Sequence, residues 1–254
     1  MNLPTSKLGD VSAITITTAD LETSLSYYQH LGFTEVLRHD FPFPWIQISD
    51  GALLIMLRKD PVPYISLTYY VKDLNKIASE LEQSGISFSQ KSPETDIVKR
   101  YLFQSPDGLT IALVTYVDGF KQPPGPTMQQ MQQSDFFNPD KYINKSCGLF
   151  GEFAHPVKDL EQSIAYWGKL GFTTLSKFEA PYPWAIISDG LAVIGLHQTG
   201  NFSYPVITYF AVDMKEKIEK LKNAGLTNFT ESDGGNSVLT TPEQQKINLF
   251  KLGM

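Results

Sequence analysis

The chain has 254 residues, of which 42% are hydrophobic and 19% are charged. This balance is typical of a globular protein that buries one large core or two ordinary ones. The sequence contains no run of about 18 or more apolar residues, and its first residues lack an apolar stretch. We therefore expect neither a membrane span nor a secretory signal.

Charge and cysteine content narrow the expected partners and compartment. The formal net charge is -6 and the pI is about 5.2. No block is rich in Lys or Arg, which disfavours nucleic acid and anionic membranes as partners. Cys147 is the single cysteine and has no partner for an internal disulfide or a Cys-rich zinc site. This favours a reducing, cytoplasmic location.

The strongest internal feature is a repeat. Residues 20–51 align without a gap to 159–190, so that ADLETSLSYYQHLGF corresponds to KDLEQSIAYWGKLGF. After a one-residue insertion, 68–74 aligns to 208–214. The sequence therefore predicts two copies of about 110 residues each, a common domain size.

Each copy also contains a weaker repeat, an aspartate that is followed 12 positions later by a glycine. The pairs are Asp20 and Gly32, Asp73 and Gly85, Asp159 and Gly171, and Asp213 and Gly225. The aspartate is predicted to cap a helix, and the glycine to end it in the left-handed conformation. Apolar residues between them form one stripe, so four short amphipathic helices are expected.

Strand-like runs precede each helix and follow it. They lie at 12–18, 65–71, 150–156 and 205–211, and at 45–49, 52–58, 100–104, 109–116, 184–188, 191–197 and 246–252. Hairpin turns are predicted at 49–51, 105–108 and 188–190. The unit of strand, helix and about three strands is thus expected four times. Residues 119–147 are rich in Pro and Gln and are predicted to be a linker.

Three motifs resemble the glyoxalase/bleomycin-resistance/extradiol-dioxygenase superfamily, also called vicinal oxygen chelate proteins. They are TADLETSLSYYQHLGF, VKDLEQSIAYWGKLGF and YLFQSPDGLTIALV. The resemblance implies an α+β fold with two tandem domains, at 8–118 and 148–254. Each domain would pair two βαβββ modules into a curved, cup-like mixed sheet. Such a chain would be a monomer with pseudo-dimeric domains or a homodimer.

Enzymes of this superfamily usually hold a divalent metal inside the cup. The resemblance places the ligand positions of the first copy on Ala13, Met56, Ser66 and Ala112-Leu113. Those of the second copy fall on Glu152, Gly195, Val206 and Asn248. Because a catalytic metal needs about three protein ligands, we expect no cofactor.

One alternative metal set is open, formed by Glu152, His197 and Asn248. His197 shares strand parity with Gly195, whereas alternation turns His155 away from the face of Glu152. A divalent-metal-dependent lyase, isomerase or dioxygenase in the second copy is therefore the main alternative function. Without a metal, Glu152 is the candidate catalytic residue, because a lone carboxylate among apolar walls would have a raised pKa and could act as a general base.

Hydroxyl-bearing and aromatic side chains are expected to line the cups instead. They are Thr68 and Tyr70 in the first copy, Thr208 and Phe210 in the second, and Trp45 and Trp184 of two Pro-x-Pro-Trp loops. Such a lining suits a planar or amphiphilic molecule. The leading prediction is metal-free binding of a small organic molecule, as in the family's antibiotic-binding members. A third reading treats the aromatics as core and the protein as a structural or regulatory module.

Overall fold

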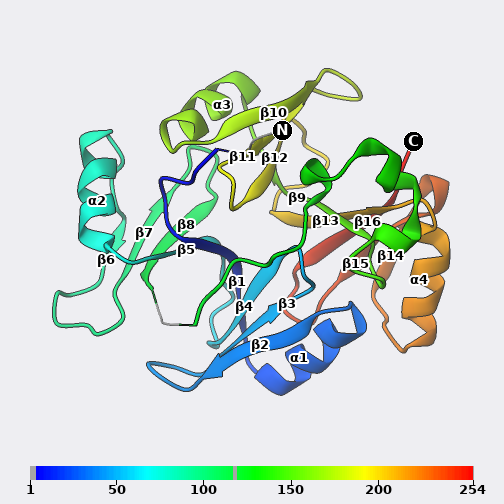
Figure 1. Ribbon diagram of the computed structural model, residues 1–254, viewed down its shortest axis with the longest axis horizontal. Coiled ribbons are helices and arrows are strands. Elements are labelled where there is room, and N and C mark those ends of the chain that lie inside the picture. Colours follow the sequence, from blue (N-terminus) through cyan, green and yellow to red (C-terminus); the bar gives the residue numbers. More distant parts are fainter. Residues whose placement is uncertain (1–3, 117–118, 254) are drawn as a thin grey trace. The chain divides into compact units, whose positions relative to one another are not determined.

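The computed structural model describes residues 4–116 and 119–253. The first half of the chain forms one eight-stranded sheet in the order β2-β3-β4-β1-β5-β8-β7-β6 (Figure 1). Its elements are β1 (Val11–Thr18), α1 (Leu21–His30), β2 (Thr34–His39), β3 (Trp45–Ser49), β4 (Leu54–Lys59), β5 (Ile65–Val71), α2 (Leu74–Gln83), β6 (Gln90–Lys91), β7 (Arg100–Gln104) and β8 (Thr110–Thr115).

The second half forms an eight-stranded sheet in the equivalent order, β10-β11-β12-β9-β13-β16-β15-β14. Its elements are β9 (Leu149–Pro156), α3 (Leu160–Lys169), β10 (Thr173–Phe178), β11 (Trp184–Ser188), β12 (Val193–His197), β13 (Val206–Ala211), α4 (Met214–Asn223), β14 (Phe229–Ser232), β15 (Asn236–Thr240) and β16 (Lys246–Lys251). Both sheets are mixed, because β5 pairs with β8 and β13 with β16 in parallel while the hairpins are antiparallel. The predicted α+β fold with tandem sheets is confirmed.

The predicted helix signals act as expected at three of the four helices. The side chains of Asp20, Asp73 and Asp159 each accept a hydrogen bond from a backbone amide of the first helical turn. All four glycines that follow the helices have positive φ, between +86° and +94°. These conformations favour glycine, so the chain turns there toward the next strand.

The predicted cap at Asp213 is wrong. Its side chain makes no capping hydrogen bond to α4. Instead, Asp213 Oδ2 lies 3.5 Å from Nζ of Lys217, one helical turn further on. The counter-charge for a buried ammonium thus takes the place of the cap.

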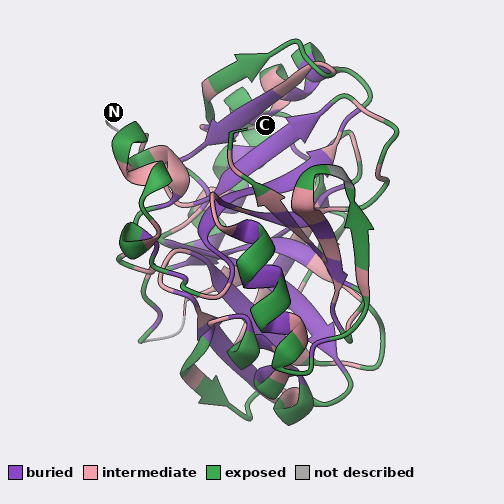
Figure 2. Ribbon diagram, turned by 90° about the vertical axis from the view of Figure 1, so that its right-hand side faces the viewer, coloured by how far each residue is buried: buried purple, intermediate pink, exposed green. Residues whose placement is uncertain are grey.

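Four of the five strands that the sequence did not indicate lie at the ends of the sheets and are short or largely exposed; the fifth, β15, is the neighbour of an end strand and is half-buried. β2 and β10 are almost entirely exposed, and both residues of β6 are exposed. The strands with predicted apolar runs, such as β1 and β9, are buried nearly throughout. Figure 2 shows that the buried residues lie mainly along strands. Burial of both faces gives a continuous apolar signal, whereas an exposed end strand gives none.

Two compact units divide the chain, and each takes segments from both copies of the repeat. Unit 1 comprises residues 1–15, 65–122 and 154–205, and unit 2 comprises residues 16–64, 123–153 and 206–254. In unit 1, α2 packs on β8 and α3 packs on β10, β11 and β12. In unit 2, α1 packs on β3 and β4, and α4 packs on β15 and β16.

Equivalent contacts join the two copies inside each unit. In unit 1, Ser163 Oγ donates to Asp107 Oδ2 over 2.5 Å. In unit 2, the counterpart Ser24 Oγ donates to Glu243. The hydroxyls of Tyr166 and Tyr27 likewise donate to carbonyls of the other copy. The repeat in sequence is therefore matched by a repeat in tertiary contacts.

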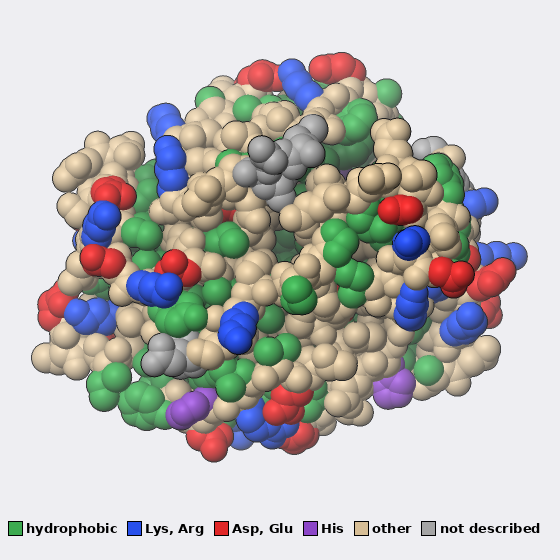
Figure 3. All heavy atoms as spheres, in the orientation of Figure 1, with side chains coloured by type: hydrophobic (Ala, Val, Ile, Leu, Met, Phe, Trp, Pro, Cys, Tyr) green, Lys and Arg blue, Asp and Glu red, His purple; other side chains and the backbone are tan. Residues whose placement is uncertain are grey.

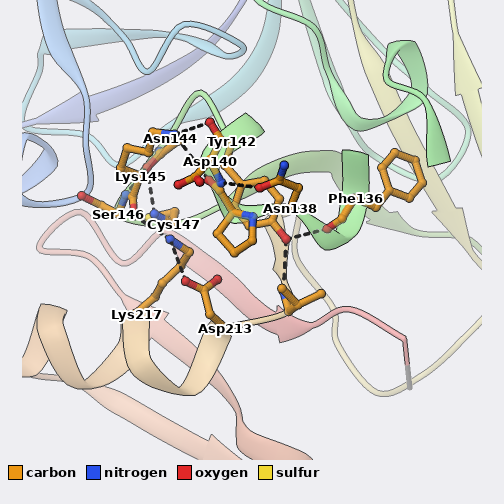
Figure 4. Close-up of polar contacts among 12 residues, drawn as sticks. Phe136, Asn138, Asp140, Tyr142, Asn144, Lys145, Ser146, Cys147, Asp213 and Lys217 are labelled. Atoms are coloured by element: carbon orange, nitrogen blue, oxygen red, sulfur yellow. Dashed lines mark hydrogen bonds and ion pairs between the residues drawn. The ribbon is translucent and has the colours of Figure 1, made fainter. Parts of the chain in front are cut away.

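Residues 123–147 of the predicted linker are ordered by polar contacts within unit 2 (Figure 4). They contain three 3-10 helices, η1 (Met128–Gln130), η2 (Gln133–Phe137) and η3 (Pro139–Lys141); a fourth, η4 (Asp233–Gly235), lies near β15. Lys217 Nζ donates to the carbonyl of Lys145 over 2.7 Å, and Tyr142 Oη donates to the carbonyl of Phe136 over 2.6 Å. Cys147 is fully buried beside this segment, and burial raises the pKa of its thiol. It is thus unsuited to act as a nucleophile.

The predicted boundaries at 8–118, 119–147 and 148–254 stay a prediction, and residues 118 and 254 lie outside the described residues. Within the part of the chain that is described, no helix is long and apolar enough to cross a membrane.

Lys and Arg side chains are interspersed with Asp and Glu side chains on the face shown in Figure 3.

Candidate functional site

The hydroxyl groups predicted to line the first cup pair with one another. Thr68 lies on β5 and is 2% exposed. Its Oγ1 lies 2.7 Å from Thr15 Oγ1 and 2.9 Å from Ser66 Oγ. These buried hydroxyls bond to one another inside the protein. Two bonds among three hydroxyls leave one O–H donor for a further partner, so these groups are engaged with one another but not saturated.

Tyr70 is covered by the start of the linker. The ring centroids of Tyr70 and Phe120 lie 4.3 Å apart at an interplanar angle of 76°. The carbonyl of Phe120 accepts a hydrogen bond from Tyr116 Oη, and Gln122 Oε1 accepts one from the amide of Ser12. A ligand that contacts Tyr70 would therefore have to displace Phe120.

The corresponding residues of the second copy are also engaged. Asn248 Nδ2 donates to Thr208 Oγ1 over 3.4 Å. The ring of Phe210 packs so closely on Gly151 that a β-carbon on this glycine would lie 2.4 Å from it. Phe210 also meets Phe250 edge to face at 6.3 Å. The structure thus brings Thr208 and Asn248 together, and it fixes Phe210 on the backbone of β9.

A divalent metal does not fit the side chains at the positions that the resemblance implies. Glu152 is 4% exposed, and three of the four positions in the first copy carry Ala, Met or Leu side chains, which offer a divalent metal no oxygen or nitrogen ligand. Across residues 4–116 and 119–253, no group of three or more His, Cys, Asp or Glu side chains is placed to hold a metal ion. A catalytic metal needs about three protein ligands. We therefore derive no chemistry through a metal.

Trp184 and His197 come together with a ring that the sequence did not single out. Phe178, Trp184 and His197 are register partners on the adjacent strands β10, β11 and β12. The Phe178 and Trp184 rings are stacked with centroids 4.2 Å apart at 18°, and the Trp184 and His197 rings are stacked 5.4 Å apart at 4°. The strand register therefore produces a stack of three rings within unit 1.

Two further rings border this stack. Tyr182 and Phe202 lie edge-on to His197, with centroids 5.8 Å and 5.7 Å away. We call Phe178, Tyr182, Trp184, His197 and Phe202 the Trp184 cluster. Phe178 is 43% exposed, so one end of the stack reaches the surface. A flat ring could extend the stack there, as offset aromatic pairs favour.

Trp45 has an equivalent setting in unit 2. His39, Trp45 and Arg58 are register partners on β2, β3 and β4, and His39 stacks on Trp45 at 6.0 Å and 20°. The Arg58 guanidinium lies over the ring of Phe43 at 4.5 Å and near the ring of Tyr64 at 6.0 Å. We call these five residues the Trp45 cluster. It carries a fixed cation where the Trp184 cluster carries an imidazole.

The two Pro-x-Pro-Trp loops hold their tryptophans in the same way. Trp184 Nε1 donates to the carbonyl of Ala180 over 3.3 Å, and Trp45 Nε1 donates to the carbonyl of Phe41 over 3.4 Å. Each indole N–H is thus satisfied by its own loop. The indole faces take part in the stacks: Trp184 lies between Phe178 and His197, and Trp45 stacks on His39, so a flat ligand would extend a stack at its outer ring.

A second imidazole of unit 1 is buried outside this cluster. His155 on β9 is 3% exposed, and neither ring nitrogen has a hydrogen-bond partner among the described residues. Burial lowers the pKa of His155 to about 4. The nearby Asp107 raises this pKa and the nearby His197 lowers it, but both effects are smaller than that of burial. His155 is therefore a neutral core residue at physiological pH.

Comparison with known proteins places this architecture. Residues 11–113 match the model of the Glyoxalase/Bleomycin resistance protein/Dioxygenase superfamily. Similar solved structures cover nearly the whole chain, second sheet included. The first copy of the repeat therefore matches this superfamily, and the whole chain has a fold similar to that of the solved dioxygenases. The resemblance that the three sequence motifs indicated is thus confirmed.

The similar structures include dioxygenases whose alignment covers both sheets of this chain. Homoprotocatechuate 2,3-dioxygenase from Arthrobacter globiformis has a TM-score of 0.62 at 13% identity, over 99% of this chain and 82% of that one. The 2,3-dioxygenase LapB from Pseudomonas sp. KL28 has a TM-score of 0.61 at 13% identity, over 98% and 94%. At such identities the likeness shows the fold alone. No curated protein matches the chain in sequence.

Proposed function

We propose that this protein binds a planar small organic molecule at its Trp184 cluster, without a metal ion. The observation that carries the proposal is the stack of Phe178, Trp184 and His197, which ends at a ring that is 43% exposed. Tyr204, in the loop between β12 and β13, is 42% exposed as well. Exposed aromatic surface beside a preformed stack favours a flat ligand over a purely structural role.

The other residues predicted to bind a ligand support this choice by their contacts. Thr68, Tyr70 and Phe210 are engaged by other protein groups, so they offer a ligand less free surface than the stack does. The metal-dependent alternative centred on Glu152 draws no specific support from the donor set. A cytoplasmic location, and a monomeric or homodimeric state, stay predictions.

The test is calorimetric titration of the protein with 1-naphthamide, a flat and neutral probe. We expect Trp184→Ala to weaken binding by about 5- to 100-fold, since loss of an aromatic contact costs about 1–3 kcal/mol. Phe137→Ala is the control, because this exposed aromatic lies in η2, outside both clusters. Equal affinity of the wild type and Trp184→Ala would contradict the proposal.

A chelator separates metal-free binding from the metal-dependent alternative. The affinity for 1-naphthamide should stay the same after the protein is dialysed against EDTA, because only side-chain contacts hold the probe. Loss of binding after dialysis, and its return with added Zn, Ni, Mn or Fe, would show instead that a metal organises the site.

A further inference from the structure

We propose that the Trp45 cluster binds the carboxylate of a planar aromatic acid through Arg58. This inference rests on the proposed function, because it treats the paired tryptophan clusters as ligand sites. It goes further in assigning the two clusters different ligands, an aromatic acid in unit 2 and a neutral ring in unit 1.

The guanidinium of Arg58 is held in place by aromatic walls. Its Cζ lies 4.5 Å above the Phe43 ring centroid and 6.0 Å from that of Tyr64. The Arg58 side chain is only 14% exposed. Arginine often stacks on aromatic faces in this way while its planar edge stays available for hydrogen bonds. The position of the cation is thus set before any ligand arrives.

Arg58 has donors that the protein does not use. Its Nη2 bonds to Asp60 Oδ2 over 2.5 Å, and the other oxygen of Asp60 accepts a bond from the amide of Val62. The Nε–H of Arg58 is buried and meets no acceptor among the described residues. A buried donor without an acceptor destabilises the fold, so the unused Nε–H on β4 suits a ligand that supplies an acceptor.

A carboxylate is the acceptor that suits this arrangement. The guanidinium presents its N–H groups as a planar fork, and a carboxylate accepts two of them side by side. The Nε–H lies beside Nη2, and Asp60 takes one of the two Nη2 hydrogens, so the ligand would bond through Nε–H and the other hydrogen of Nη2. A neutral amide offers one acceptor oxygen and no charge, and it would bind less tightly.

The surroundings favour an aromatic group on that acid. Trp45 is the cross-strand partner of Arg58, and His39 stacks on its indole. Phe41 and Val62, in the loops that flank these strands, are 52% and 65% exposed. A ring attached to the carboxylate would find apolar surface beside the cation.

The counterpart in unit 1 lacks this charge. The position equivalent to Arg58 is His197, which packs face to face on Trp184 instead of presenting a fork. The two copies thus keep the tryptophan and its loop but differ at the polar position. This difference provides a matched test within one molecule.

The test titrates the full chain with 1-naphthoate and with 1-naphthamide, which differ only in the charged group. Wild-type protein should bind 1-naphthoate about 10- to 100-fold more tightly than Arg58→His does, because charge-assisted bonds are worth about 1.5–3 kcal/mol. Arg58→Lys keeps the charge but not the fork, and it should retain part of the preference for the acid. Arg100→His is the control for net charge.

The outcomes separate this inference from the proposed function. Wild-type protein that binds the acid no better than the amide would overturn the role of Arg58, even if no variant folded. A preference for the acid that persists in Arg58→His, with an unchanged melting temperature, would also overturn it. Either result, together with Trp184-dependent binding of 1-naphthamide, would leave the proposed function standing. Loss of both effects would remove both proposals.

Discussion

His155 shows how one residue couples folding to pH. In the folded protein its pKa is about 4, whereas an unfolded histidine titrates near its ordinary value of 6.5. The folded state therefore stays neutral at a pH at which the unfolded state already binds a proton. Stability is complete above about pH 6.5 and falls as the pH drops toward 4.

We expect His155→Ile to remove most of this acid sensitivity. The equivalent position in the first copy is Ile16, which is buried at 3% exposure, so the fold accommodates isoleucine there. The wild type should lose about 2–3 kcal/mol of unfolding free energy between pH 7.5 and pH 4.5 through this group. The measurement is urea unfolding at both pH values. A wild type and a variant that lose the same amount would show that other groups dominate.

The sequence predicts the part of the candidate site that the internal repeat contains. Trp45 and Trp184 stand in duplicated loops, and His197 shares strand parity with Gly195. Arg58, His39 and Phe178 were not singled out, because only the cross-strand register places them beside the tryptophans. Register depends on turn length and on bulges such as the one near Leu37, which single residues do not reveal.

At the scale of elements, the four helices share one sequence pattern, but the aspartate before the helix does not cap all four of them. Asp159 caps α3 through the amide of Gln162 at 3.0 Å. Asp213 makes no such bond and instead forms an ion pair with Lys217, whose side chain is 6% exposed. The sequence could not separate these cases, because the spacing from aspartate to glycine is the same whether the carboxylate accepts a bond from a backbone amide or pairs with a lysine.

Substitution by asparagine distinguishes the two roles. Asparagine and aspartate are comparable N-caps, so Asp159→Asn should change the free energy of unfolding by less than about 0.5 kcal/mol. Asp213→Asn removes the counter-charge of a buried ammonium and should cost about 1 kcal/mol or more. Thermal or urea unfolding of the two variants at pH 7.5 checks this. Equal costs would mean that both aspartates act as caps.

At the scale of the whole molecule, the compact units do not coincide with the copies in sequence. Periodicity and motifs predicted the four helices and the repeated order of strand, helix and strands, because each copy carries its own signals, but they did not locate β2, β6, β10, β14 and β15. The grouping into units depends on contacts between residues of different copies, and such contacts produce no motif in the local sequence. Tyr209 Oη donates to Asp50 Oδ2 over 2.6 Å in unit 2, and Ser6 Oγ donates to Asp189 Oδ2 over 2.6 Å in unit 1.

This grouping predicts that the two copies need each other. Asp50 and Asp189 are 6% and 0% exposed. Backbone amides of the same copy bond to Oδ1 of each carboxylate, whereas separation of the copies would remove the hydroxyl donor that bonds to Oδ2. A buried charged group that loses its partner costs several kcal/mol. Neither copy alone is therefore expected to reach the stable fold.

We expect residues 1–122 and 123–254 to associate when they are expressed together as separate chains. The cut lies between Gln122 and Pro123, where the chain passes from unit 1 to unit 2. A tag on one fragment should retain the other, and the pair should elute as a complex of about 28.5 kDa with one melting transition. Tyr209→Phe, which removes one contact to Asp50, should lower that transition. Fragments that each show a cooperative melt and elute apart would mean that the copies fold independently, and that the shared units add little to stability.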